Sequence, residues 1–198
     1  MTLGLTLGLG GALATGASAL AGMFLVSRGR IYLDLGWGRS LHALGPITVE
    51  INAPRNLVFE QISSPYLGQT PAGLRSKLRV LERASDLAVA EHRTKLPLMD
   101  AVTVEAVHFE PPGRISFRLL QGPVPHVSEE FLLEEVGSGT ALSYQGELGA
   151  DLWLLGRIYG GSIVRPAWER TVAASLDDIK KGAEQRAAAR RRRTTGES

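Results

Sequence analysis

Six strand-like segments follow one another in the middle of the chain with only short breaks between them. They span residues 78–82, 87–96, 101–110, 114–121, 126–135 and 140–148. Two of the breaks, Pro111-Pro112-Gly113 and Gly137-Ser138-Gly139, consist of turn-forming residues. Antiparallel strands can be joined by tight turns, whereas parallel strands need long crossover connections. The spacing therefore predicts an antiparallel meander.

One strand and one short helix are predicted before the meander. Ile47, Val49 and Ile51 alternate with polar residues, which is the period of a half-buried strand. Residues 55–63 follow as a short helix with apolar side chains on one side. Gly45-Pro46 is a turn-forming pair, so we place the start of the domain there.

A long amphipathic helix is predicted after the meander. Asp151 is the expected N-cap residue of this helix. Gly160, Gly161 and Pro166 predict a kink or break within it. An apolar stripe continues at spacings of four, four and three residues, through Trp168, Val172, Leu176 and Ile179.

This order of elements indicates an α+β fold in which a strongly curved antiparallel sheet wraps around a long C-terminal helix. The sheet and the helix each bury one face against the other. The groove between them can stay partly unfilled, and such sites are concave and apolar, with a few polar groups that orient a ligand. We therefore expect an apolar ligand between the sheet and the C-terminal helix.

Three segments resemble a known superfamily. They are ITVEINAPRNLVFEQI (47–62), FEPPGRISFRL (109–119) and VGSGTALSY (136–144). Together with the long amphipathic end, they resemble the START-related superfamily (SRPBCC; polyketide cyclase/dehydrase and lipid transport). The resemblance implies the helix-grip fold, also seen in birch-pollen-allergen-like proteins, with about six or seven strands around the C-terminal helix. Members bind lipids, quinones, steroids or polyketides, and a minority are cyclases. The resemblance assigns no catalytic residue to this chain.

Strand alternation predicts which side chains face the ligand. The polar candidates are His92, Glu129 and Tyr144, each in register with apolar residues of its strand. Such groups either orient a ligand hydroxyl or carbonyl or act as acid and base, whereas the structural alternative is a rim position or a satisfied pair. The aromatic candidates lie on the sheet and on the final helix: Phe117, Phe131, Tyr159 and Trp168.

The strand at 101–110 leaves its inward face open. Val102, Val104 and Ala106 share one face with His108, whereas Thr103 and Glu105 share the other face with Val107 and Phe109. Both faces therefore combine apolar and polar residues, so alternation alone does not decide between them.

No cofactor or metal is expected. The chain has no cysteine, which excludes disulfides, thiolate metal ligands and cysteine nucleophiles. The four histidines, His42, His92, His108 and His126, lack metal-ligand spacing, and the sequence has no phosphate loop, zinc-protease or serine-hydrolase motif.

The N-terminal segment, residues 1–27, is predicted to be a transmembrane anchor. Leu3–Val26 contains no charged residue and exceeds the roughly 20 residues that a spanning helix needs. Arg28, Arg30 and Arg39 follow it, and by the positive-inside rule they keep the domain cytoplasmic. We expect a single-pass protein of the cell membrane. The alternative is a cleaved signal peptide with a small-residue site near 17–21, although a basic n-region is missing.

Two flanking segments are also open to alternatives. Residues 28–45 are expected to lie on the membrane surface as a juxtamembrane segment, or to pack on the domain of residues 46–185 as an extra element. Residues 186–198 form a basic tail that we expect to be disordered. This tail is otherwise a solvated extension of the last helix, or contacts anionic lipid through Arg190–Arg193. No nucleic-acid binding is expected, because the body offers no matching basic, aromatic-rich face.

The function expected from these features is a membrane-tethered binding or carrier protein for a lipid, isoprenoid or quinone-like ligand. Membrane contact would run through Leu3–Val26. One alternative is a cyclase or dehydratase that acts on a polyketide-like substrate with His92, Glu129 or Tyr144 as acid and base. The other is a non-enzymatic module that holds a partner protein.

Overall fold

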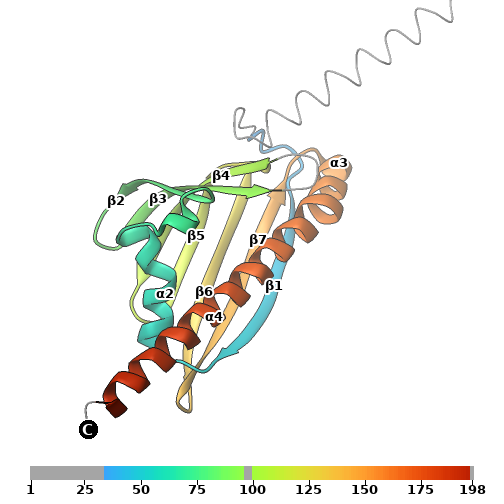
Figure 1. Cartoon of the computed structure of the whole chain (residues 1–198). Helices are drawn as coiled ribbons and strands as arrows, with labels where there is room; N and C mark the ends of the chain where they lie inside the picture. The colour runs from blue at the N-terminus through green and yellow to red at the C-terminus, as the bar shows by residue number, and fades with distance from the viewer. Residues whose placement is uncertain (1–33, 96–99, 197–198) are drawn as a thin grey trace, which may run out of the picture.

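The computed structural model of the chain describes residues 34–95 and 100–196. These residues form one antiparallel sheet in the order β1-β7-β6-β5-β4-β3-β2, with helices on one face (Figure 1). The strands are β1 (Ser40–Ile51), β2 (Leu78–Arg83), β3 (Leu87–Lys95), β4 (Asp100–Glu110), β5 (Arg114–Gln121), β6 (His126–Val136) and β7 (Gly139–Ala150). The helices are α2 (Arg55–Leu67), η1 (Ala72–Leu74), α3 (Trp153–Ile158), η2 (Tyr159–Val164) and α4 (Arg165–Gly196).

The predicted meander is confirmed. Strands β2 to β7 pair with their sequence neighbours, and β1 pairs with β7 at the far side of the sheet. The β6–β7 connection shows why the turns are tight: Val136 pairs with Gly139, and Gly137 has a φ of +59°, which glycine adopts without steric cost.

The core lies between the concave face of the sheet and the two helices α2 and α4 (Figure 1). Leu142 of β7, Leu57 of α2 and Leu176 of α4 are almost fully buried in one apolar cluster. Further along α4, Ala183 and Ala187 are buried in the same cluster, and α4 contacts both α2 and β1. The predicted amphipathic stripe of the last helix is therefore the face that α4 turns to the sheet.

β1 begins at Ser40 instead of Ile47, so the domain start predicted at Gly45-Pro46 falls inside a strand. Residues 40–44 pair with residues 146–150 of β7, and Leu44 is only 1% exposed. The register shifts between Leu44 and Ile47, where Gly45 has a φ of +73°. This irregularity produced the turn-like sequence signal. Residues 40–45 thus pack on the domain as an extra strand segment instead of lying on a membrane surface.

The last helix has the predicted break but not the predicted cap. The wide π-helical turn η2 contains Gly160 and Gly161 and is followed by Pro166 near the start of α4. Asp151 does not cap α3: its cap residue is Leu152 in the left-handed conformation, without a side-chain cap hydrogen bond. The Asp151 carboxylate is engaged elsewhere, as shown below.

The basic tail is helical up to Gly196, so the predicted disorder of residues 186–198 is wrong for most of this segment. Ala187 is 4% exposed in the core, and Arg190 pairs with Glu60 of α2 at 3.1 Å. These contacts extend the helix beyond the predicted domain end because α4 still packs against α2 there.

The predicted anchor, Leu3–Val26, lies outside the described residues. Within residues 34–95 and 100–196, no helix is long and apolar enough to cross a bilayer.

Candidate functional site

An aromatic row crosses the inner face of the sheet. Phe117 of β5 meets Phe131 of β6 with ring centroids 5.3 Å apart, and Phe131 meets Tyr144 of β7 at 5.8 Å. Tyr66, at the end of α2, extends the row toward β4 and contacts Phe117 and Phe109. The predicted inward register of β5, β6 and β7 is confirmed by this packing.

The carboxyl group of Glu129 lies within this aromatic row, which we call the aromatic wall. Glu129 lies on β6 opposite Gly146 of β7, two pairs away from the Phe131–Tyr144 pair and on the same face of the sheet. Its Oε2 atom accepts a 2.7 Å hydrogen bond from the Tyr144 hydroxyl and a 2.8 Å hydrogen bond from Trp168 Nε1. The sheet and α4 thus meet at one carboxyl oxygen.

The surroundings of Glu129 favour the protonated form of its carboxyl group. Burial, reinforced by the nearby carboxylate of Glu105, raises the pKa of Glu129 to about 7, although the hydrogen bonds from Trp168 and Tyr144 oppose the shift. Burial and the charge of Glu129 also raise the pKa of Tyr144. Near neutral pH, Glu129 can therefore be either a hydrogen-bond donor or an acceptor, while Tyr144 stays a hydroxyl.

A second polar cluster lies on β3 and β4. Glu105 is 4% exposed and accepts a 2.6 Å hydrogen bond from Thr103. Its other oxygen lies 3.3 Å from His92 Nδ1. The Nε2 atom of the same ring lies 3.3 Å from the Tyr66 hydroxyl. His92 therefore bridges a buried carboxyl and the partly buried Tyr66. Burial raises the pKa of Tyr66 most, followed by the charges of Glu105 and Glu129.

The structure brings six of the seven predicted residues to these two clusters and the aromatic row between them. They are His92, Phe117, Glu129, Phe131, Tyr144 and Trp168. Tyr159 lies apart from them: its hydroxyl reaches the Pro123 carbonyl between β5 and β6 at 3.4 Å. Tyr159 therefore helps to fasten η2 to the sheet.

Thr103, Glu105 and Tyr66 were not selected from the sequence. β4 turns Thr103, Glu105, Val107 and Phe109 inward, and these four side chains are buried. Phe109 was the available signal, because a large aromatic residue favours the core face over a face with His108. Tyr66 had no comparable signal, since its position depends on how α2 packs against β3.

An open pocket of about 420 Å³ lies elsewhere, between the end of α2 and the edge strand β2. Its lining includes four arginines, Arg75, Arg79, Arg83 and Arg93. Three of them are already engaged, since Arg75 donates to the Thr70 carbonyl, Arg83 donates to the Gly68 carbonyl and Arg93 pairs with Glu91. This pocket is cationic and differs from the apolar groove predicted between the sheet and the last helix.

No grouping of three or more His, Asp or Glu side chains suited to a metal ion is present in the described part of the chain. The Glu105–His92 pair alone offers too few ligands for such a site. The side chains of the two clusters offer hydrogen bonding and proton transfer.

A family model described as polyketide cyclase / dehydrase and lipid transport matches residues 47–184. The chain belongs to this family. This chain has the helix-grip fold, with a seven-stranded curved sheet around the long helix α4, and the family is one whose members take small apolar ligands. A search of curated proteins found no match.

Solved structures of the same fold differ widely in what their names describe. The Zhui aromatase/cyclase from Streptomyces sp. R1128 is 18% identical, with a TM-score of 0.57, over 75% of this chain and 95% of that one. Norcoclaurine synthase from Thalictrum flavum is 14% identical, with a TM-score of 0.58, over 77% and 92%. A protein from Thermus thermophilus is 16% identical, with a TM-score of 0.52, over 75% and 98%. At these identities the likeness concerns the fold.

Proposed function

We propose that this protein binds a lipid, isoprenoid or quinone-like molecule between the concave face of the sheet and α4. The observation that carries the proposal is the position of Glu129 in the aromatic wall. Both of its donors, Tyr144 and Trp168, reach Oε2. The other carboxyl oxygen, Oε1, is the atom that would meet a polar group of a ligand.

The chemistry of Glu129 suits a ligand with one oxygen function on an apolar body. The protonated carboxyl donates to a carbonyl, and the ionised carboxylate accepts from a hydroxyl. Phe117 and Phe131 supply apolar surface beside it. Burial of the ligand's apolar area then favours binding by roughly 25 cal/mol per Å².

The proposal includes the location of the protein. Leu3–Val26 would anchor it in the cell membrane as a single-pass protein with a cytoplasmic domain, in the phase where such ligands are stored. The supporting observation is the absence of charge over this segment. Sequestration of an apolar molecule beside its source bilayer is the carrier function that follows.

Native mass spectrometry of the full chain, extracted in mild detergent, tests the proposal. We expect a co-purifying apolar molecule, and competition by it against a fluorescent fatty-acid probe. Glu129→Leu should weaken probe binding about tenfold, which corresponds to about 1.4 kcal/mol. Glu130→Leu is the matched control, because Glu130 is the next residue on β6 and pairs with Arg114 outside the core. If neither a co-purifying molecule nor probe binding is found, the proposal fails.

The raised pKa of Glu129 favours one second candidate, an acid–base enzyme of the cyclase or dehydratase type. A carboxyl with a pKa of about 7 exchanges protons readily at neutral pH. Glu129→Gln separates the two functions, because the amide keeps the acceptor oxygen but cannot transfer a proton. An enzyme would lose turnover of a polyketide-like substrate, whereas a carrier would keep most of its binding.

A further inference from the structure

Large apolar side chains are exposed around α3, at one end of the sheet (Figure 1). We call this surface the α3 patch; it consists of Trp37, Trp153, Leu154, Leu155, Ile158 and Ile163. Trp153 is 66% exposed and Leu155 is 70% exposed. Scattered exposed apolar residues are normal, but five of these six lie within residues 153–163, and the Trp37 carbonyl accepts a hydrogen bond from the neighbouring Leu152 amide. A concentration of this kind is typical of an interaction surface.

The backbone displays these residues because α3 carries apolar side chains on more than one side. Trp153, Leu154 and Leu155 follow one another directly. Successive residues of a helix point in different directions, so these three cannot all face the protein core. Leu152 and Trp153 also have positive φ values of 75° and 45°, which side-chain-bearing residues rarely adopt. This conformation is held by hydrogen bonds from their amides to the carbonyls of Trp37 and Gly38, at 2.8 and 2.9 Å.

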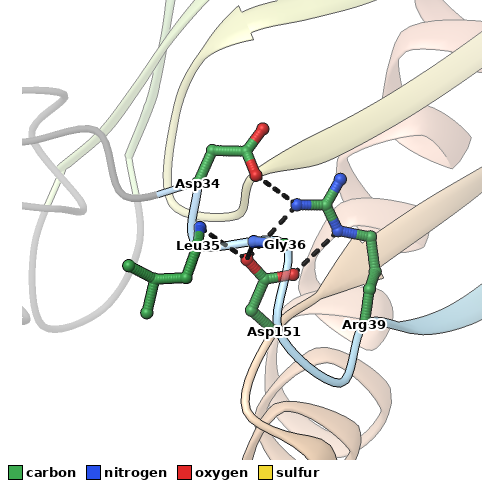
Figure 2. Close-up of polar contacts among 5 residues, drawn as sticks. All are labelled: Asp34, Leu35, Gly36, Arg39 and Asp151. Atoms are coloured by element: carbon green, nitrogen blue, oxygen red, sulfur yellow. Dashed lines mark hydrogen bonds and ion pairs between the residues drawn. The ribbon is translucent and has the colours of Figure 1, made fainter.

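A clamp ties the start of the described chain to the same place. Figure 2 shows the Asp151 carboxylate, which accepts hydrogen bonds from the amides of Leu35 at 2.9 Å and Gly36 at 2.8 Å. Arg39 Nε donates to the same carboxylate at 2.7 Å, and Arg39 also pairs with Asp34. Asp151 directly precedes the α3 patch, so Asp34 is fastened beside it.

The clamp limits how far the patch can lie from the predicted anchor. Residues 27–33 are the chain between Val26 and Asp34. A fully extended chain covers at most about 3.6 Å per residue, so this link spans no more than about 29 Å. If Leu3–Val26 lies in a bilayer, Asp34 lies within that distance of the bilayer surface, and the clamp holds Asp34 next to the start of the α3 patch.

We propose that the α3 patch docks into the interfacial region of the bilayer that carries the N-terminal anchor. This inference rests on the membrane tether proposed above. Trp37 and Trp153 suit the headgroup level, where tryptophan is enriched. Arg157 is the one charged residue between Leu152 and Val164, and a single cation among apolar residues complements lipid phosphate while its stem stays in the apolar zone.

The same geometry places the arginine-rich end of α4 away from this bilayer. α4 begins beside α3 and ends at the opposite side of the molecule (Figure 1). At 1.5 Å per residue, Arg190 lies about 38 Å from Arg165 along the helix axis. Charges screened beyond about 8 Å at physiological salt contribute little across that distance. When α4 stands away from the membrane, the α3 patch and Arg190–Arg193 cannot reach the same bilayer. Docking of the α3 patch then excludes a contact of Arg190–Arg193 with anionic lipid.

The experiment uses the full chain, which has no cysteine, so one introduced cysteine reports one position. Leu155→Cys and Ala189→Cys carry an environment-sensitive nitrobenzoxadiazole label, and both positions are exposed. The proteins are reconstituted into phosphatidylcholine vesicles, with or without phosphatidylglycerol and with or without acyl-chain bromine. We expect a blue shift at position 155 and at least threefold more quenching by brominated lipid there than at position 189. Adding Leu154→Glu should remove that difference.

The outcomes separate docking from tethering. If the protein floats with the vesicles but the label at 155 stays water-like, docking is wrong and the tether stands. If the protein does not float, both are wrong. A blue shift at 155 without quenching by brominated lipid means that a protein surface covers the patch, which overturns docking. Stronger quenching at 189 means that the arginine-rich end faces the membrane, which also overturns it.

Discussion

Tyr144 and Glu129 connect two neighbouring strands through a 2.7 Å hydrogen bond on the inner face of the sheet. Tyr144 is completely buried, and its hydroxyl donates to the same carboxyl oxygen that Trp168 of α4 reaches. The bond therefore fixes the orientation of the one ionisable group in the aromatic wall whose pKa lies close to neutral pH. Most of the predictions below concern this carboxyl and the residues that position it.

Tyr144→Phe should raise the pKa of Glu129 further, because the variant removes a donor that favours the ionised form. It should also lower the free energy of unfolding by about 1 kcal/mol, the usual net value of one hydrogen bond. A pH titration of the labelled glutamate carboxyl carbon by NMR measures the first effect. Tyr159→Phe is the control, since its hydroxyl makes a longer bond of 3.4 Å to Pro123 and does not touch Glu129.

Glu129→Gln should make the free energy of unfolding less dependent on pH. The pKa of Glu129 is raised from 4.5 to about 7 in the folded state, so the folded protein retains a proton that the unfolded chain has lost. The corresponding stability is present below pH 4.5 and disappears as the pH rises through 7, an effect of about 3 kcal/mol. Urea denaturation from pH 4.5 to 8 measures it. Glu130→Gln is the control, because Glu130 faces outward. If the free energy of unfolding changes equally with pH in both variants, the pH dependence does not come from Glu129.

Asp151→Asn should loosen the N-terminal residues of the described chain. Hydrogen bonds from Arg39, Gly36 and Leu35 lower the pKa of Asp151, so the stability it contributes is present above the usual carboxyl pKa and is lost as the pH falls through the lowered value. The asparagine cannot accept all of these bonds. Hydrogen exchange should become faster at the amides of Leu35 and Gly36 and stay unchanged in the β6–β7 hairpin. Unchanged exchange at both amides would show that the Asp151 carboxylate is not needed to hold Leu35 and Gly36 in place.

Gly146→Ala should destabilise the fold and disturb Glu129 together. A Cβ atom at Gly146 would lie 2.6 Å from the Ser128 carbonyl oxygen and 2.7 Å from Glu129 Cβ, so the two strands must separate. Overpacking of this kind costs about 1–3 kcal/mol. Thermal unfolding and the Glu129 titration should both change. Gly113→Ala is the control, because a Cβ there has no neighbour within 4 Å, and a loss as large as that of Gly146→Ala would contradict the steric argument.

Local patterns were sufficient for most of the fold. Alternation placed Phe117, Phe131 and Tyr144 on the inner face, and the structure agrees, because a strand in a half-buried sheet must send its apolar residues to one side. The same alternation failed on β4, where both faces carry apolar residues. It also failed at β1, because the turn-like Gly45-Pro46 sits at a register shift within a continuous strand.

The sequence by itself determined the meander, the long amphipathic helix and the inward position of Glu129, since these depend on neighbours a few residues away. Only the tertiary structure decided which partners Glu129 has. Trp168 lies 39 residues further along the chain, and the Glu105 carboxylate acts on Glu129 through space. Asp151 shows the same limit: its type suggested a helix cap, but the sheet brings Arg39 to it from 112 residues away. Such contacts depend on the pairing of β1 with β7 and the packing of α4, and no local period encodes either.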